Sequence, residues 1–453
     1  METLDRWIER QYRHSAGAMM RSISPVGIVK QRPGFAQIVK PRKGSIVASP
    51  VLGAYDPEPD YFFHWYRDSA VVVDALRLLF EDASVECAAL AHFGDFVRFS
   101  LSLQGLDGRS LSGPGAGPDP GPASWRNAIA PDYRQYVRTD EDLAAAHGEA
   151  VAGETRVNPD GTLDLSKWPR PQNDGPSMRA ITLLRWRQSA QFDPGLNGLV
   201  DALLRADLEF TRRHWREACF DIWEEEKGQH YYTLRVAAAA LDGGAGWFEL
   251  QGERAAALAC RADAAEMLRL LDGYWREDLQ FYRSRMLEAK APSGKELDIA
   301  VIFAALHAAG SGETHSVRDP RMHATLAKLE ALFDAEYAIN RNREGRAPAM
   351  GRYAGDVYYS GGAYYFSTLA AAEFCYRAAL MSQAIASPAR KSLVERGDAF
   401  LETVRRFTPP SGELSEQFDQ QTGVQRSAQQ LAWSYAAFIS CAAARRQVIP
   451  RSA

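Results

Sequence analysis

The stretch SAVVVDALRLLFED at residues 69–82 places valine, leucine, alanine and phenylalanine on nearly every face of a helix. A helix that is apolar all round is buried all round. Five further segments that we predict to be helical share this character: 176–190, the segment that begins at His230, 299–309, 363–383 and 427–445. We therefore expect these six segments to form the inside of the fold.

The other predicted helices alternate with these along the chain and are amphipathic. They are residues 3–22, 86–105, 196–217, 252–275, 318–336 and 389–407. This alternation predicts six helix hairpins in two concentric rings, which is an all-α (α/α)6 barrel, a twelve-helix toroid, over residues 1–453 as a single domain. A helical solenoid is the alternative, but it would half-bury both helices of each pair and show a short repeat, which the sequence lacks.

The connections between the predicted helices are long, and a few short strands are expected among them on one rim of the barrel. Ile38-Val39 and Ile46-Val47 indicate strands within residues 35–50. A connection of about 70 residues follows the segment 86–105. Its run GPGAGPDPGP at residues 113–122 cannot form regular structure. Asp68 is placed to cap the helix predicted at 69–82.

Composition and motifs exclude several classes of function. The 453 residues carry a formal net charge of −4, so there is no general electrostatic reason to bind nucleic acid or an anionic membrane. No run of 18 apolar residues and no apolar leader is visible, so we expect a cytoplasmic protein. The five cysteines are scattered, and we expect no metal site, no cofactor and no disulfide framework. The sequence leaves the oligomeric state open.

Five clusters of polar and aromatic residues each precede a helix that is predicted to be buried. They are Arg67-Asp68, Arg170 to Asp174, Trp223-Glu224, Arg352 to Tyr359 and Glu416-Gln417. In an up-and-down ring, the connections that enter the inner helices all lie on the same rim. We therefore expect the five clusters to converge around one mouth, at the N-termini of the inner helices.

The stretch CFDIWEEE at residues 219–226 is the most acidic of these clusters. Three consecutive acids beside a tryptophan indicate a carboxyl with a raised pKa, which suits a general acid. The simpler interpretation is the first turn of a helix, where the helix dipole favours acids, and spacing alone favours that interpretation. Carboxylates, arginines and aromatic rings together suit a neutral polyol, and two carboxylates on opposite sides of a sugar ring are what glycoside hydrolysis needs.

The chain resembles the glucoamylases of glycoside hydrolase family fifteen from Leu4 to about Tyr435. Six segments carry the resemblance in the same order: 46–50, 60–69, 170–176, 221–225, 351–359, and 414–419 with 433–435. The fold of that family, an (α/α)6 barrel, agrees with the helix pattern. The resemblance implies an inverting exo-hydrolase that acts on an oligosaccharide and releases β-D-glucose from the non-reducing ends of short α-glucans.

The resemblance also implies a role for each matched residue. Glu224 matches the general acid and Glu416 the general base, and Gln417 matches a neighbour that helps to hold the attacking water. The other matched positions are expected to contact the sugar or line its pocket: Tyr61, Trp65, Arg67, Asp68, Trp168, Trp223, Glu225, Arg352 and Trp433. From the neighbours along the chain, we expect Glu224 to hold its proton more tightly and Glu416 to be ionised.

Two departures from the family pattern leave the cleaved bond open. Asn173 stands where fungal members carry an arginine, and Tyr364 stands where many carry a tryptophan, both toward the outer subsites. An α-1,4, an α-1,6 or an α,α-1,1 linkage (trehalose) is therefore possible. A non-catalytic carbohydrate-sensing domain is the alternative outside the enzymes, but retention of both candidate catalytic carboxyls argues against it.

Overall fold

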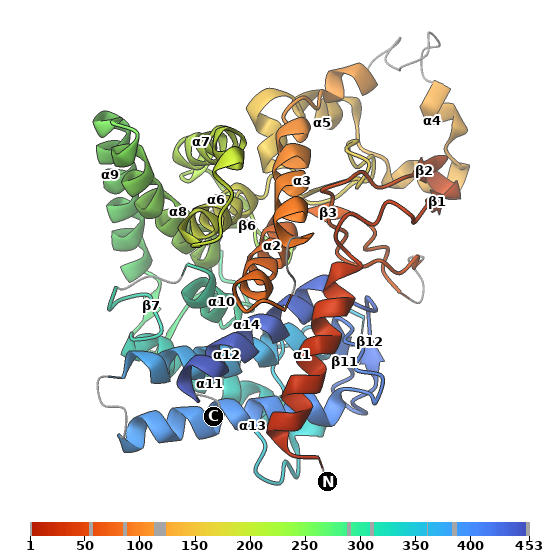
Figure 1. The fold of residues 1–453 in the computed structure, drawn as a ribbon. Helices are drawn as coiled ribbons and strands as arrows, with labels where there is room; N and C mark the ends of the chain where they lie inside the picture. Colours follow the sequence, from red (N-terminus) through yellow and green to blue (C-terminus); the bar gives the residue numbers. More distant parts are fainter. Residues whose placement is uncertain are drawn as a thin grey trace.

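Six helices form a closed inner ring, in which each helix packs against the next and α14 returns to α2 (Figure 1). They are α2 (Tyr66–Glu81), α6 (Asp174–Gln188), α8 (Tyr231–Leu250), α10 (Ala300–His307), α12 (Tyr365–Met381) and α14 (Ala432–Val448). The computed structural model describes residues 2–53, 58–84, 88–112, 124–287, 291–308, 312–359, 361–382 and 387–449.

Six further helices surround this ring. They are α1 (Leu4–Met20), α3 (Ala88–Leu103), α7 (Asn197–His214), α9 (Arg254–Asp272), α11 (Pro320–Glu336) and α13 (Pro388–Phe407). Burial separates the two rings, because fourteen of the 17 residues of α12 are buried, whereas only five of the 19 residues of α9 are. The predicted (α/α)6 barrel is confirmed, and each of its twelve helices lies within a few residues of its predicted range.

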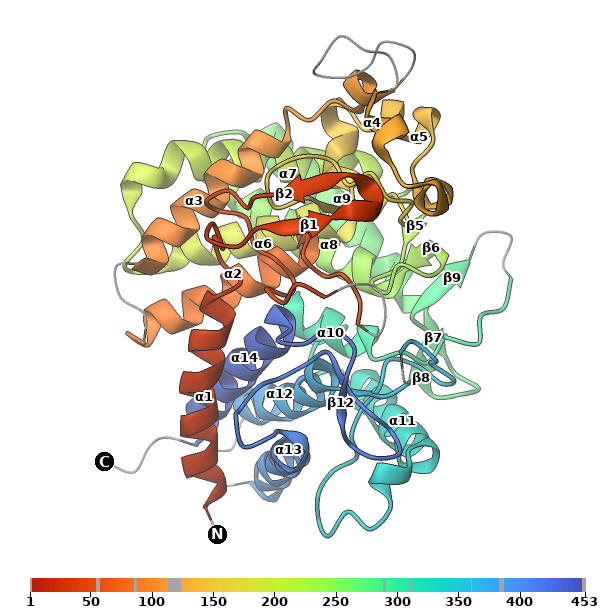
Figure 2. The ribbon, with the colours of Figure 1, turned by 90° about the vertical axis from the view of Figure 1, so that its right-hand side faces the viewer.

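Short antiparallel strands hold the connections between the helices, and two of them, β1 (Lys30–Arg32) and β2 (Gln37–Val39), lie in front of the helices in Figure 2. Six of the strands form simple pairs: β1 with β2, β3 (His64–Trp65) with β4 (Arg156–Val157), and β7 (Trp275–Arg276) with β8 (Phe281–Tyr282). The others form two three-stranded sheets. In one, β6 (Lys227–His230) lies between β5 (Cys219–Phe220) and β9 (Arg285–Leu287), and in the other, β11 (Gln417–Phe418) lies between β10 (Ala363–Tyr364) and β12 (Gln425–Arg426). Strands β3, β6 and β10 run directly into inner helices. This pairing fixes the entry to those helices.

The long connection between α3 and α6 is more ordered than its composition suggests. It contains two short helices, α4 (Ser124–Ala128) and α5 (Asp140–Ala145), and the 3-10 segments η2 (Gly108–Leu111), η3 (Pro131–Tyr136) and η4 (Gly148–Gly153). The run at 113–122, which we predicted to be irregular, lies outside the described residues. Ile38-Val39 lies in β2 as predicted. Ile46 forms only an isolated bridge with Ile23, and the backbone N–H of Ile46 donates to His64 Nδ1.

Two local predictions at the starts of inner helices are wrong. Trp65 occupies the N-cap of α2, and Asp68 lies inside the first turn instead of capping it. The acidic stretch at 219–226 is not the first turn of a helix either, because α8 begins only at Tyr231. Instead, the three glutamates lie in and beside the turn between β5 and β6. The helix dipole therefore does not explain why acids gather there.

Buried apolar side chains form a core that extends from Trp7 in α1 to Val448 in α14. None of the described helices is both long and apolar enough to cross a bilayer. The cysteines of the described ranges, Cys219, Cys260, Cys375 and Cys441, are buried free thiols, and Cys87 lies outside these ranges. In the same ranges, no group of three or more histidine, cysteine or acidic side chains is arranged to hold a metal ion.

Candidate active site

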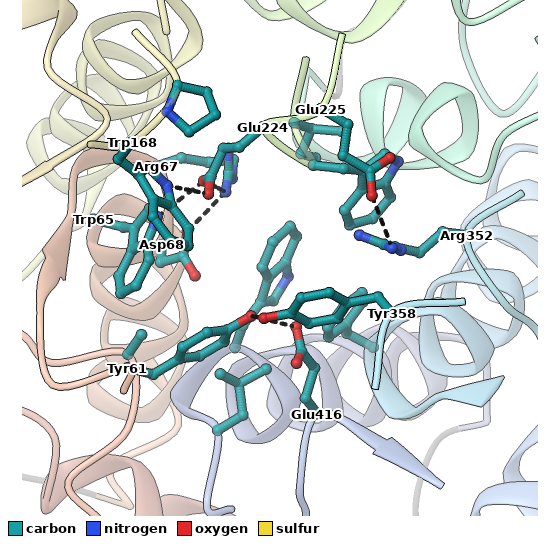
Figure 3. A pocket seen from close by; sticks show the side chains of 17 residues that line it. Tyr61, Trp65, Arg67, Asp68, Trp168, Glu224, Glu225, Arg352, Tyr358 and Glu416 are labelled. Carbon is teal, nitrogen blue, oxygen red and sulfur yellow. Dashed lines mark hydrogen bonds and ion pairs between the residues drawn. The ribbon is translucent and has the colours of Figure 1, made fainter. Parts of the chain in front are cut away.

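A pocket of about 210 Å³ opens at the end of the barrel where the inner helices begin (Figure 3). It is lined by Ala48, Tyr61, Trp65, Arg67, Asp68, Trp168, Pro169, Ile222, Trp223, Glu224, Glu225, Arg352, Tyr358, Phe366, Glu416, Leu431 and Trp433. These residues come from the segments that enter α2, α6, α8, α12 and α14. The clusters that are far apart in the sequence therefore meet around one mouth.

Glu224 projects from a tight turn that Asp221 organises. Asp221 Oδ1 accepts hydrogen bonds from the backbone N–H groups of Trp223 at 3.0 Å and Glu225 at 2.9 Å, and its carbonyl accepts one from Glu224 at 2.9 Å. Glu224 itself has a φ of +65°, which is rare for a residue with a side chain. Backbone strain of this kind persists only where the surroundings enforce it. In Figure 3, the Glu224 side chain points toward Arg67 and the Glu225 side chain toward Arg352.

A buried arginine lies beneath this turn and joins the carboxylates around it. Arg285, at the start of β9, is 2% exposed and lies 2.7 Å from Asp221 Oδ2 and 2.8 Å from Glu226 Oε2. Its second terminal nitrogen bonds Asp298, which also accepts the indole N–H of Trp223 at 2.8 Å. Arg285 thus connects the two carboxylates that hold the turn on either side of Glu224.

Three nitrogen donors converge on the largely buried Glu224 carboxyl. Trp65 Nε1 donates to Oε1 at 2.9 Å and Trp168 Nε1 to Oε2 at 2.6 Å, while a terminal nitrogen of Arg67 lies 3.4 Å from Oε1. Burial raises the pKa of Glu224, and the guanidinium of Arg67 opposes that rise. The donors therefore favour the ionised form against the effect of burial.

Arg67 and Asp68 form the adjoining wall. The Arg67 guanidinium is 3.2 Å from both Asp68 and Asp174, and it lies 5.4 Å from the ring centre of Trp433. Asp68 Oδ2 is the oxygen of that ion pair, and neither it nor Arg67 Nε is exposed. Arg67 and Asp68 therefore line the pocket as one ion pair.

Glu416 faces the pocket from the opposite side, beside β11 (Figure 3). Tyr61 Oη donates to Glu416 Oε1 at 3.3 Å and lies 2.8 Å from Tyr358 Oη, while Ser427 Oγ donates to Oε2. Burial raises the pKa of Glu416 to about 7, against the hydrogen bond from Ser427. Burial thus raises the pKa of both carboxyls, so the surroundings of Glu416 do not favour its ionised form as its neighbours along the chain had suggested.

Glu225 forms the third wall and is already engaged by neighbouring groups. Its carboxylate accepts from Tyr353 Oη at 2.6 and 2.7 Å, from Arg352 at 3.1 Å and from Lys295 Nζ at 2.5 Å. Arg352 is in turn fixed by Asp356, with N···O distances of 2.6 and 2.7 Å. The two cations and the phenol hold the Glu225 carboxylate in place at the wall of the pocket.

Gln417 is the one predicted site residue that does not line the pocket. It follows Glu416 in an extended segment, where successive side chains point to opposite faces, and it is fully buried with Nε2 donating to Tyr364 Oη at 2.8 Å. Asn173 and Tyr364, the two departures from the family pattern, do not line the pocket either. Their identity therefore does not reshape its wall directly.

Sequence reasoning missed three residues that organise the site. Tyr358 contacts Tyr61 and lay within an aromatic segment that we quoted without singling it out. Ser427 reaches Glu416 only because the β11–β12 pairing brings the two together, and Arg285 reaches the acidic turn through the β6–β9 pairing. No local spacing in the sequence marks either of these last two contacts.

Comparison with known proteins places the chain among sugar hydrolases. Residues 152–443 match Glycosyl hydrolases family 15. A probable glucoamylase of Schizosaccharomyces pombe is 28% identical over 489 residues, which cover 99% of this chain and 93% of that protein. The glucoamylase of Neurospora crassa is 26% identical over 448 residues, which cover 90% of this chain and 64% of that protein.

Solved structures agree with these relatives. The structure of Hormoconis resinae glucoamylase superimposes with a TM-score of 0.78 at 25% identity, and the match covers 99% of this chain and 75% of that one. The family match extends over more than half of the chain and includes four of the five segments that line the pocket. This protein is a glycoside hydrolase that belongs to glycosyl hydrolase family 15.

Proposed function

We propose that the protein is an inverting, exo-acting α-glucosidase that releases β-D-glucose from the non-reducing ends of short α-glucans. The observation that carries the proposal is the pair of largely buried carboxyls, Glu224 and Glu416, on opposite sides of one pocket (Figure 3). An inverting glycosidase needs an acid on one side of the sugar and a base on the other, about 6.5–9.5 Å apart, with room for a water.

Glu224 is the proposed general acid, which protonates the glycosidic oxygen as the bond to C1 breaks. The proton transfer leaves Glu224 as a carboxylate. The indole N–H groups of Trp65 and Trp168 and the guanidinium of Arg67 stabilise that carboxylate. Donors that are placed before the reaction where charge develops lower the barrier without further reorganisation. The wall around Glu224 is therefore complementary to the state that follows proton donation.

Glu416 is the proposed general base, which takes a proton from the water that attacks C1 from the opposite face. A carboxylate with a raised pKa is a stronger base, and burial raises the pKa of Glu416 to about 7. The hydroxyls of Tyr61 and Ser427 each bond one carboxylate oxygen and fix its orientation. Gln417 lies behind this wall, so the water-holding role that the family resemblance implied is not part of the proposal.

The rest of the pocket is proposed to bind the terminal sugar. The side chains of Arg67 and Asp68, which both line the pocket, suit the outer hydroxyls of the sugar, and the rings of Trp65, Trp223 and Trp433 suit its apolar faces. The volume of about 210 Å³ is below the roughly 300–1,000 Å³ of pockets for drug-sized ligands. A pocket of this size encloses one sugar unit, which favours cleavage from chain ends.

The next sugar unit is proposed to lie toward Trp168, Glu225 and Arg352 at the rim. All three residues line the pocket, and Figure 3 shows Trp168 on one side of Glu224 and Glu225 with Arg352 on the other. The existing contacts of Glu225 with Tyr353 and Lys295 hold its carboxylate in place for an incoming hydroxyl. This rim decides which linkage is accepted, because a different linkage changes the direction in which the second sugar leaves the pocket.

The test is glucose release by the wild-type protein from maltose, maltotriose, isomaltose, trehalose and soluble starch. We expect turnover of the α-1,4-linked oligosaccharides, with loss of at least about 100-fold in Glu224→Gln and in Glu416→Gln. Circular dichroism of both variants controls for folding. A wild-type protein that binds these sugars without cleaving any would reject the proposal, as would normal activity in either variant. Cleavage of isomaltose or trehalose alone would keep the site and change the bond.

A further inference from the structure

A buried arginine lies behind the two indoles that bond Glu224. Arg156, in β4, is wholly buried, and it is not among the residues that line the active-site pocket. The carbon of its guanidinium lies 3.6 Å from the ring centre of Trp168 and 4.8 Å from that of Trp65. It also lies 4.0 Å from the ring centre of Phe63. One guanidinium therefore lies over both of the rings whose N–H groups bond the proposed acid.

The local structure explains how one side chain reaches both rings. Arg156 is the Cα partner of Trp65 in the β3–β4 pair, so the two side chains lie on the same face of the strands. The guanidinium is then held by the segment that returns toward the pocket, because Nε donates to Asp164 Oδ2 at 2.9 Å and Nη2 donates to Ser166 Oγ at 3.1 Å. Trp168 follows Ser166 by two residues. The strand pair thus brings Trp65 to Arg156, and the returning segment brings Trp168 to it.

The polarity of each indole matches its two neighbours. An aromatic ring is negative on its face and positive at its edge, so the face attracts a cation and the edge attracts an anion. In both indoles, Arg156 lies over the face, and the N–H at the edge donates to Glu224, at 2.9 Å from Trp65 and 2.6 Å from Trp168. Figure 3 shows both side chains on the same side of Glu224. A cation over the face also draws electron density from the ring, which makes the N–H a stronger donor.

We infer that Arg156 is a positioning residue for the proposed general acid, and that it acts on Glu224 through the indoles of Trp65 and Trp168. The inference rests on the proposed function, because it concerns the state that Glu224 reaches when it has given up its proton. Aligned N–H donors with a positive charge behind them stabilise a carboxylate more than a neutral carboxyl. Arg156 therefore strengthens Glu224 as an acid from outside the pocket.

The charges around Glu224 support this assignment. Burial raises the pKa of Glu224 most, and Asp68 adds to that rise, while Arg67 and then Arg156 lower it. The phenol of Tyr61 also senses Glu224, whose charge adds to the rise that burial gives the pKa of the phenol. Arg67 lines the pocket, whereas Arg156 lies behind it. A variant of Arg156 therefore changes the surroundings of the acid without removing a group from the pocket wall.

The simpler interpretation is that Arg156 serves stability alone. It forms an ion pair with Asp164, which Arg170 also reaches at 3.3 Å. Arg138 provides the comparison, because it is 1% exposed and belongs to the same group of ion pairs. It bonds Glu154 at 2.9 Å and the Asp164 carbonyl at 3.3 Å. Loss of either arginine should lower the stability of the protein, but only loss of Arg156 should change the acid.

The pH dependence of tryptophan fluorescence tests the inference without turnover. The part of the signal that is lost in Glu224→Gln reports ionisation of Glu224, since this carboxyl bonds two indoles. Its midpoint should rise by roughly one pH unit in Arg156→Met and by less in Arg156→Lys, which keeps a charge but not the planar guanidinium. Arg138→Met is the matched control and should keep the wild-type midpoint. An unchanged midpoint in either folded Arg156 variant would overturn the inference, as would an equal rise in Arg138→Met.

Kinetics on two substrates separate failure of the inference from failure of the proposed function. Fluoride leaves without a proton, so Arg156→Met should lose about 10-fold in kcat on maltose and less than about twofold on α-D-glucosyl fluoride. Arg138→Met should keep the wild-type ratio of the two rates. Equal losses on the two substrates in Arg156→Met would overturn the inference. A wild-type protein that cleaves neither substrate would reject the proposed function instead, and the fluorescence midpoints would still decide the role of Arg156.

Discussion

The two sides of the active-site pocket hold their carboxyls by different means. Glu224 sits on a strained turn and accepts from two indole nitrogens, with a guanidinium close by. Glu416 sits beside a strand and accepts from the hydroxyls of a tyrosine and a serine. Nitrogen donors and a positive charge favour the carboxylate. Hydroxyls orient Glu416 but leave its pKa at about 7. This difference supports the proposed roles, in which Glu224 releases a proton and Glu416 accepts one.

The largest expected effect is on activity, where the losses caused by Glu224→Gln and Glu416→Gln should depend differently on the leaving group of the substrate. Fluoride leaves without protonation, so Glu224→Gln should lose about 1,000-fold on maltose and much less on α-D-glucosyl fluoride. Glu416→Gln should lose activity on both substrates, since both need an activated water. Values of kcat/KM for the two variants on the two substrates provide the check. Equal losses for Glu224→Gln on both substrates would remove its role as the acid.

The second prediction concerns stability and is confined to the Glu416 side. Burial raises the pKa of Glu416 from its ordinary value of 4.5 to about 7 in the folded protein. Between pH 4.5 and pH 7, the folded state therefore binds more protons than the unfolded state. Stability is therefore lost as pH rises through this window, by up to about 3 kcal/mol at about 1.4 kcal/mol per unit. Glu416→Gln removes this loss, and its advantage over wild type should grow from pH 4.5 to pH 7. Urea unfolding at several pH values measures it, and a constant difference would contradict the account.

The third prediction tests what positions Glu224. Arg285→Lys keeps a positive charge but cannot reach Asp221 and Asp298 together, so the turn should shift. We expect kcat on maltotriose to fall by about 10- to 100-fold while KM changes less, because a small misplacement of the acid is costly. Glu226→Gln is the matched control, since the Glu226 side chain bonds Arg285 and Ser293, while the contact of Glu226 with Asp221 is made by its backbone carbonyl and is kept. An equal kcat on maltotriose in the two variants would show that the ion pairs of Arg285 serve stability alone.

The smallest expected effect is a shift in the pH profile. The acidic limb of kcat/KM should lie near pH 7, where Glu416 gains its proton. Ser427 donates to Glu416 and so favours the ionised form, and Ser427→Ala should move the limb upward by roughly one pH unit. Ser415→Ala is the control, because Ser415 adjoins Glu416 in the chain but bonds the Gln417 carbonyl. A downward shift in Ser427→Ala would contradict the assigned base.

The helical part of the fold could be predicted because its signal is local. Whether a segment such as 363–383 is apolar all round can be read within the segment itself, and the ring follows from the alternation of such segments. The two-residue strands carry no periodic pattern, so the β5–β6 turn was taken for the start of a helix. The start of α8 at Tyr231 lies one residue from the predicted His230, but the strained turn at Glu224 has no signal in the sequence.

The site could be predicted only where its residues lie in the connections themselves. Glu224, Glu416 and Arg67 stand in recognisable clusters, and the pocket brings them together. Ser427 and Arg285 act through strand pairings that no spacing reveals. The raised pKa of Glu416 could not be predicted either, since burial raises it and the hydrogen bonds that oppose the rise come from Ser427 and Tyr61, not from neighbours in the chain.

The anomeric form of the first glucose released tests the central claim most directly. A pair of carboxyls on opposite sides of the sugar, with a water between Glu416 and C1, predicts inversion. Proton NMR during the first minutes of maltotriose hydrolysis, before mutarotation, should show β-D-glucose ahead of the α anomer. Initial release of α-D-glucose would mean two displacements and a covalent intermediate, and it would contradict the roles assigned to Glu224 and Glu416.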